Sequence, residues 1–128
     1  MNGLFSEARA LGQALPGTYG GLGDAVRHST AAGMLTQGME SLGLTPFGME
    51  PWVASNYLGY LNEVLGMGRR MMKGYDFIDA EDMAMDFLNN FIGSQLGRDA
   101  DTSGEVIKRV FENLEKLQIN KAEEKARD

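Results

Sequence analysis

Two segments of the sequence carry polar residues at positions i, i+3 and i+4, a spacing that places three side chains on one face of an α-helix. These residues are Asp24, Arg27 and His28 in the first segment and Asp86, Asn89 and Asn90 in the second. Between the two segments, Asn56, Tyr60 and Glu63 follow at i, i+4 and i+7, which is again one helical face. The sequence therefore predicts three helices that each present a polar face.

All three polar faces are flanked by apolar residues, so we expect their side chains to point toward one interior site. An ionised carboxylate in such surroundings is costly unless it is paired or hydrogen-bonded, so each acid needs a partner. His28 is the only histidine of the chain, and any imidazole chemistry must use it. A histidine that a carboxylate orients can act as a general base. We predict that His28 is the base and that Asp86 or Glu63 orients it.

Amides and cations beside such a base would bind the substrate. Side-chain amides can stabilise the oxyanion that develops during hydrolysis, and we assign this role to Asn89 and Asn90. We expect Arg27 either to hold a substrate anion or to pair with an acid. Asp24 and Tyr60 complete the predicted substrate-binding set. No metal ion or other cofactor is expected.

Two other interpretations use the same residues. In the first, the polar groups form a buried network that fixes how the helices pack, and His28 is one satisfied member of that network. In the second, His28, Glu63 and Asp86 bind a metal ion. One nitrogen ligand and two carboxylates suit a hard or borderline cation rather than a structural zinc ion. The spacing of the residues does not choose among the three interpretations.

Helices are needed to carry these polar faces, and apolar periodicity together with turn residues predicts about five of them. We expect helices over about 2–15, 24–42, 51–72, 79–96 and 103–125. The 51–72 segment is apolar almost all round, which predicts a buried, central helix. Asp24 is placed to cap the 24–42 helix. Because no long segment alternates with a strand period, we expect an all-α, single-domain bundle.

Composition is typical of one globular domain. The 128 residues fall in the usual size range of a domain, so we expect residues 1–128 to fold as one unit. Cys is absent, which excludes disulfides, thiolate nucleophiles and Cys-ligated metal centres. Gly occurs 17 times, close to twice its average usage of about 7%. Five glycines interrupt predicted helices and indicate close helix packing, namely Gly33, Gly38, Gly59, Gly66 and Gly93.

Charge and hydropathy argue against several classes of partner. The net charge of −6 argues against binding to nucleic acid, because such surfaces rely on clustered Lys and Arg. No apolar stretch approaches the roughly 18 residues of a membrane span. Glu7 and Arg9 interrupt the place where a secretory signal would have its apolar region. The weak amphipathic stripe of residues 1–15 is expected to pack on the domain, with contact to a membrane surface as the alternative.

The polar positions together form a longer pattern, Asp24-x-x-Arg27-His28, then Glu63, then Met85-Asp86-x-x-Asn89-Asn90-x-x-Gly93. Over about residues 20–97 this pattern resembles an uncharacterised helical domain family of phage genomes and of the C-termini of large bacterial secreted or toxin-like proteins. The helices over 2–15 and 103–125 would be additions to that core. The chain departs from the family twice, because Asn62 replaces a second histidine and Ser29-Thr30-Ala31 replaces an aromatic residue.

The resemblance marks the same site but implies no reaction. A looser similarity, at the level of a His–Asp pair on facing helices, links the site to secreted phospholipases. We therefore predict a phage-type or bacterial helical domain, cytoplasmic or virion-associated, with a His–carboxylate–Asn site capable of hydrolysis. The alternative is a non-enzymatic virion-structural, assembly or ejection protein. Its nine Met residues and glycine-rich helices would suit a protein partner or a homo-oligomer.

Overall fold

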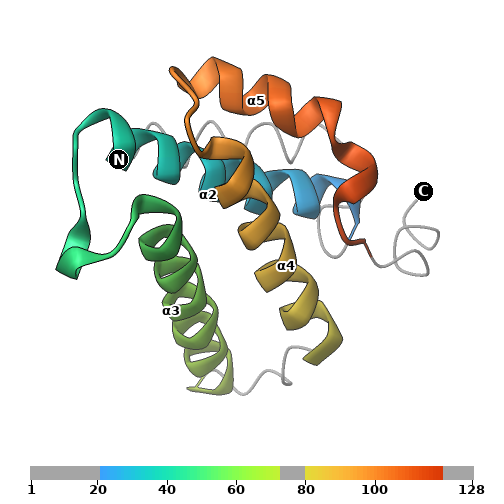
Figure 1. The fold of residues 1–128 in the computed structure, drawn as a ribbon. Coiled ribbons are helices and arrows are strands. Elements are labelled where there is room, and N and C mark those ends of the chain that lie inside the picture. Colours follow the sequence, from blue (N-terminus) through green and yellow to red (C-terminus); the bar gives the residue numbers. More distant parts are fainter. Residues whose placement is uncertain (1–20, 73–79, 120–128) are drawn as a thin grey trace.

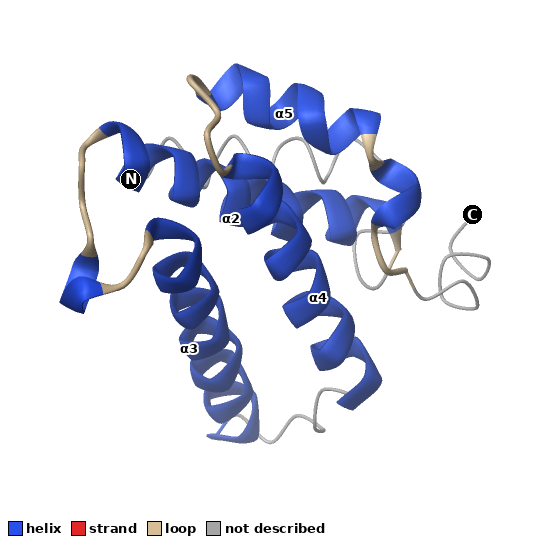
Figure 2. Ribbon diagram, viewed as in Figure 1, coloured by secondary structure: helices blue, strands red, loops and turns tan. Residues whose placement is uncertain are grey.

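The structure, a computed structural model, describes residues 21–72 and 80–119, and residues 1–20, 73–79 and 120–128 lie outside the described part. The described residues form four α-helices and two short 3₁₀ turns, with no strand (Figure 2). These elements are α2 (Leu22–Ser41), η1 (Pro46–Gly48), α3 (Pro51–Met72), α4 (Ala80–Gly97), α5 (Ser103–Glu112) and η2 (Leu114–Lys116). For these residues the prediction of an all-α chain is confirmed.

The helices α2 and α4 are the pair around which the others pack. The helices α3 and α4 run in opposite directions, and α2 crosses behind them (Figure 1). The helix α5 lies across the end of α4 and against α2. Both α2 and α4 contact each of the other three helices, and the contact between these two is the most extensive, so the α2–α4 pair is the centre of the described bundle, with most of α2 buried.

The prediction that the 51–72 helix is central and buried is wrong in its position, although its bounds agree with α3. One face of α3 carries large apolar side chains that stay exposed, namely Tyr57, Leu58, Leu61 and Leu65. The central helix α2 is inconspicuous in the sequence because most of its buried residues are small. These include Ala25, Ser29, Thr30, Ala32, Gly33 and Thr36. Small side chains allow neighbouring backbones to approach closely, which large apolar side chains prevent.

The closest approach in the fold is the crossing of α2 and α4. A Cβ atom on Gly93 would overlap the carbonyl oxygen of Ser29, and one on Gly97 would overlap that of Gly33. A Cβ atom on Gly33 would lie 2.8 Å from the carbonyl oxygen of Gly93. The expectation of close helix packing is therefore confirmed at Gly33 and Gly93. It is wrong at Gly38 and Gly66, where a Cβ atom would meet nothing within 4 Å.

Apolar side chains from α2, from the turn between α4 and α5, from α5 and from the segment after α5 form the core. Its buried members are Ala25, Val26, Met34, Ala100, Val106, Val110 and Leu117. The helix α5 ends at Glu112, earlier than predicted, because the side-chain amide of Asn113 donates a 2.7 Å hydrogen bond to the carbonyl oxygen of Arg109. The turn η2 then brings Leu117 into the core instead of extending the helix.

Some predictions fall outside the described residues. These are the helix over 2–15, the start of the fourth helix at 79 and the end of the last helix toward 125. Within the described residues, no helix combines the length and the apolar character needed to cross a membrane.

We expect Gly93→Ala to lower the free energy of unfolding by about 1–3 kcal/mol, because the added methyl group would push α2 and α4 apart. Urea denaturation measures this change. Gly68→Ala is the matched control, since Gly68 lies in α3 with open space around it. That substitution should stabilise the chain by up to about 1 kcal/mol. Equal effects of the two substitutions would contradict the close crossing.

Carboxylate and hydroxyl groups cap the start of α5. Thr102 Oγ1 accepts a hydrogen bond from the backbone N–H of Glu105, and Glu105 Oε2 accepts one from the backbone N–H of Asp101. The bond from Asp101 lowers the pKa of Glu105, and Arg109 adds to this effect. A carboxyl group whose pKa is lower in the folded state stabilises the fold above its unfolded pKa, and this contribution is lost as the pH falls.

We therefore expect Glu105→Gln to be destabilising at pH 7. The difference from the wild type should shrink as the pH falls below about 4.3, the ordinary pKa of Glu. Thermal melts of both proteins between pH 7 and pH 3 measure the difference. A difference that does not change with pH would show that the Glu105 charge does not act in the cap.

Candidate functional site

The imidazole of His28 lies between two carboxylates. Its Nε2 atom is 3.5 Å from Oδ1 of Asp24 and 3.3 Å from Oδ1 of Asp86. Asp24 and His28 are four residues apart on α2, so one turn of helix brings them together. Asp86 reaches the same nitrogen from α4, because the glycine contacts hold α4 close to α2. Two helices therefore supply the three central atoms of the site.

Two further charged side chains adjoin these three. Glu63 projects from α3, is 7% exposed, and is hydrogen-bonded to Asp86. Arg27 forms an ion pair with Oδ1 of Asp24 on the other side. We call His28, Asp24, Asp86 and Glu63 the His28 cluster. These four residues come from α2, α3 and α4, and they are the part of the predicted three-helix polar site that the structure brings together.

The His28 cluster is only partly buried. The side chains of His28, Asp24 and Asp86 are 16%, 12% and 15% exposed. Each of these side chains therefore keeps some solvent-exposed surface, whereas the side chains of a fully sealed network would have none. This partial exposure favours a ligand site over a purely internal network.

Burial and neighbouring charges shift the pKa values of the cluster. Burial raises the pKa of Asp86 to about 7, an effect that the charge of His28 opposes and that Glu63 and Asp24 increase. In its protonated form Asp86 donates its hydrogen bond to the carboxylate of Glu63. Burial lowers the pKa of His28, but its contact with Asp24 and the charges of the three acids outweigh burial, so the pKa is raised. The shift of His28 therefore reflects the acids around it, and the shift of Asp86 reflects mainly its burial.

Asp24 has a different role from the one expected of it. The helix α2 begins at Leu22, one turn earlier than a cap at Asp24 would require, and Gly21 is its N-cap residue without a side-chain hydrogen bond. Asp24 therefore lies inside the first turn, where it is buried and contacts both Arg27 and His28. The i, i+4 spacing of Asp24 and His28 was the signal for this contact.

Asn89 is not a substrate-facing amide, which corrects the prediction. Its Nδ2 atom donates to the carbonyl oxygen of Gln118 at 2.9 Å, and its Oδ1 atom accepts from the backbone N–H of Gln118 at 2.7 Å. The side chain is 2% exposed. Both ends of the amide bond the backbone of Gln118 and the side chain is buried, so Asn89 fastens the segment after α5 to α4 and is not presented to a substrate.

Asn90 and Tyr60 also lie apart from the three central atoms. The Asn90 amide packs on α3 at Gly59, where a Cβ atom would lie 2.7 Å from Asn90 Nδ2. Tyr60 is half-exposed, and its ring lies 5.7 Å from that of Phe87. Neither residue has a contact with His28 among the described interactions. Their predicted substrate roles therefore have no support from the geometry of the described residues.

Asn56, the first residue of the polar face on α3, binds α4 directly. Its Nδ2 atom donates at 2.8 Å to the hydroxyl oxygen of Ser94 and at 2.8 Å to the carbonyl oxygen of Trp52. Ser55 on the same helix donates to the carbonyl oxygen of Ala32 in α2 at 2.9 Å. These bonds fix α3 against its neighbours and so set the position from which Glu63 reaches Asp86.

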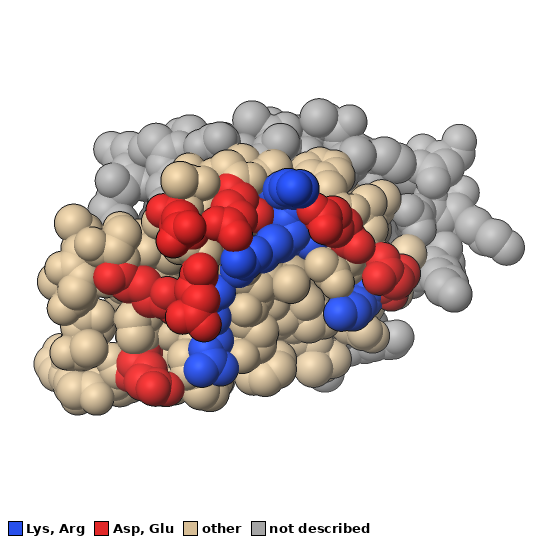
Figure 3. Space-filling view, turned by 45° about the horizontal axis from the view of Figure 1, so that its top comes forward, with Lys and Arg blue, Asp and Glu red and all other residues tan. Residues whose placement is uncertain are grey.

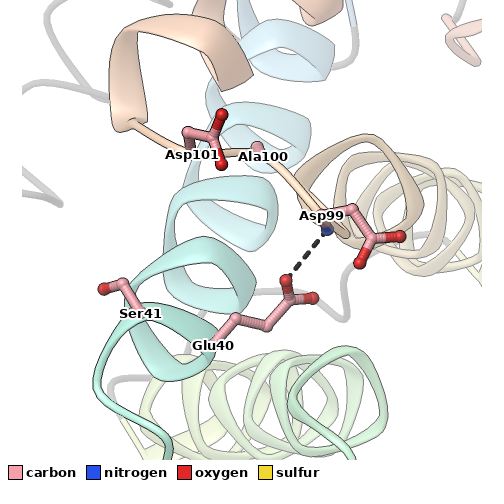
Figure 4. Close-up of a pocket in the computed structure, with 5 residues that line it drawn as sticks. All are labelled: Glu40, Ser41, Asp99, Ala100 and Asp101. Atoms are coloured by element: carbon pink, nitrogen blue, oxygen red, sulfur yellow. Dashed lines mark hydrogen bonds between the residues drawn. The ribbon is translucent and has the colours of Figure 1, made fainter.

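A second group of acidic residues lies far from His28. A pocket where α2 ends beside the turn between α4 and α5 is lined by Glu40, Ser41, Asp99, Ala100 and Asp101 (Figure 4). Glu40 Oε2 accepts a 2.9 Å hydrogen bond from the backbone N–H of Asp99. Glu40 lies twelve residues after His28 on α2, about 18 Å along the helix. The pocket has no histidine, so a substitution in it is a control for substitutions in the His28 cluster.

The surface around α5 carries charges of both signs. Figure 3 brings the top of Figure 1 forward and shows Lys and Arg side chains lying among Asp and Glu side chains. Arg109 illustrates the mixing, because it pairs with Glu105 at 2.6 Å and also donates to the carbonyl oxygens of Leu96 and Arg98. On this face, the described residues form no extended basic patch.

Comparison with known proteins identifies no relative, since no family model, curated protein or solved structure matches the chain. The resemblance to the phage and toxin-like domain family therefore stays a prediction that rests on the motif itself.

We expect Asn89→Ala to lower the free energy of unfolding by about 1–3 kcal/mol, because the two backbone groups of Gln118 lose their partner. Chemical denaturation measures the loss. Asn62→Ala is the control, since Asn62 is exposed on α3 and should change stability little. An Asn89→Ala chain of wild-type stability would contradict the structural role of this amide.

Proposed function

We propose that the His28 cluster is a hydrolytic site that holds and activates a water molecule. The proposal uses the same histidine and acids that the sequence singles out, and it omits Asn89 and Asn90. The phage-type or bacterial setting suggested by the motif is part of the proposal, and the motif adds no substrate to it.

The observation that carries the proposal is the triangle of Nε2 of His28 with Oδ1 of Asp24 and Oδ1 of Asp86. A water molecule can cap this triangle at about 2.8 Å from each atom, which is hydrogen-bonding distance. Because the three side chains are partly exposed, both the water molecule and a small substrate can approach from solvent.

The groups of the triangle suit the removal of a proton from water. Imidazole and carboxylate are the general bases that hydrolytic enzymes use most, and each accepts a hydrogen bond in its unprotonated form. Arg27 lies beside the triangle, and 28% of its side chain is exposed. Its guanidinium is the group next to the cluster that suits a substrate anion.

Hydrolysis of chromogenic carboxylic esters and phosphodiesters by the purified chain tests the proposal. We expect His28→Gln to abolish turnover while the melting temperature stays within a few degrees of the wild-type value. Asp101→Asn is the matched control, because it removes one carboxylate from the remote acidic pocket and should leave turnover unchanged.

Two results would contradict a hydrolytic site. One is turnover that does not depend on His28, which means either no turnover of any ester class or equal turnover by the wild type and His28→Gln. The other is a collapse of the fold in His28→Gln or Asp86→Asn, by the roughly 3–5 kcal/mol expected when a buried pair loses one member. The second result would assign the His28 cluster to a structural network.

The second candidate is an interaction protein, such as a virion-structural, assembly or ejection component. The exposed apolar face of α3 favours it, because Leu58, Leu61 and Leu65 follow one another at i, i+3 and i+7 without cover. On α4 the side chains of Leu88 and Phe91 are also about half-exposed. Contiguous apolar surface of this kind is typical of contacts with a protein partner or a second copy of the chain.

A further inference from the structure

We infer that the His28 cluster binds a divalent metal ion of the manganese-to-zinc class through Nε2 of His28, Oδ1 of Asp24 and Oδ1 of Asp86. The inference rests on the proposed function of activating water, but it assigns the activation to a bound ion, because the three atoms would then bind the ion and the ion would bind the water molecule. Metal binding can be tested without any substrate, so the metal site and the hydrolytic activity can each be disproved separately.

The spacing of the three atoms matches that of ligands around a metal ion. A charge-assisted N–H···O bond is about 2.7–2.9 Å long, and the two contacts of Nε2 measure 3.5 and 3.3 Å. Ligands bound about 2.0–2.2 Å from a metal ion lie roughly 3.0–3.5 Å from one another in octahedral or tetrahedral geometry. All three ligand atoms also lie within 4.8 Å of one another.

The fold holds these ligands in place before any ion binds. Asp24 and His28 belong to adjacent turns of the same buried helix. Asp86 is fixed relative to them by the contacts of Gly93 and Gly97 with the backbone of α2. A preformed arrangement of this kind lowers the entropy cost of binding, because the helices need not be ordered by the ion.

Both carboxylate ligands are themselves held by neighbouring side chains, as is usual around protein-bound metals. Glu63 contacts Asp86 and orients its carboxyl group; when Asp86 binds the ion as a carboxylate, the proton of this hydrogen bond has to lie on Glu63. Arg27 contacts the same Oδ1 atom of Asp24 that faces His28. Its positive charge therefore competes with the ion, and affinity is expected to be moderate.

The mixture of one imidazole nitrogen and two carboxylate oxygens selects the class of ion. Imidazole is a good ligand for zinc, iron, nickel and copper, whereas carboxylates suit manganese, magnesium and calcium. A site with both is best matched by borderline ions, for which we take Mn²⁺ and Zn²⁺ as probes. Three protein ligands leave coordination positions for water, whose pKa a bound cation lowers toward neutrality.

Titration of the chelator-treated wild-type chain with Zn²⁺, followed by proton NMR, tests the inference. His28 is the only histidine, so its ring resonances are recognised without further assignment. We expect saturation at one Zn²⁺ per chain, with a shift of the His28 resonances that ends at the same point. Zn²⁺ binding that leaves these resonances unchanged would overturn the inference.

Variants measured by calorimetry with Zn²⁺ and Mn²⁺ locate the site. We expect His28→Gln and Asp86→Asn to lose binding, and Glu63→Ala, which removes the side chain that contacts Asp86, to weaken it about 10- to 100-fold. Arg27→Gln should tighten binding, because it removes a competing charge. Asp101→Asn, in the remote acidic pocket, should bind as the wild type does. Far-UV circular dichroism of each variant shows that the chain remains folded.

Wild-type affinity in a folded His28→Gln chain, or loss of binding in Asp101→Asn, would overturn the inference. The outcome is separate from that of the proposed function. Binding at His28 without ester hydrolysis supports the metal site and contradicts the hydrolytic proposal. Hydrolysis that depends on His28 and persists in the presence of a chelator supports the hydrolytic proposal and contradicts the metal site.

Discussion

The contact of two glycines with the backbone of α2 is the constraint on which the described structure depends. Gly93 and Gly97 of α4 leave no room for a side chain against Ser29 and Gly33. The resulting backbone contact makes the α2–α4 pair the centre of the bundle. It also places Asp86 of α4 beside an imidazole on α2. The geometry of the His28 cluster is therefore a consequence of helix packing rather than of any loop, and sites carried by packed helices are rigid.

Charge gives the cluster its chemical character. Three carboxyl groups from three helices surround one imidazole, and among the described residues the guanidinium of Arg27 contacts one of them. Burial raises the pKa of Asp86, whereas the neighbouring carboxyl groups raise the pKa of His28 against the opposite effect of burial. The proposed activation of water and the proposed binding of a metal ion both draw on these carboxyl groups and on the partial exposure that the side chains retain.

The sequence predicts the all-α class, the bounds of α3 and the joining of His28, Asp86 and Glu63, because helical periodicity is a local property that spacing reveals. It does not predict which helix is central. Large apolar residues such as Leu61 suggest burial yet lie on an outer face, while the small residues of α2 pack inside. The position of Asn89 shows the same limit. Its spacing on the helix places it on the polar face, but only the tertiary structure brings Gln118 to both ends of its amide.

A crystal structure of the chain grown with one equivalent of Mn²⁺ tests the central claim most directly, through the anomalous scattering of the ion. The account predicts one peak about 2.0–2.2 Å from Nε2 of His28 and from one oxygen each of Asp24 and Asp86. It also predicts that α2 and α4 stay in contact at Gly93. A peak in the pocket of Glu40, Asp99 and Asp101 with none beside His28, or helices separated at Gly93, would contradict it.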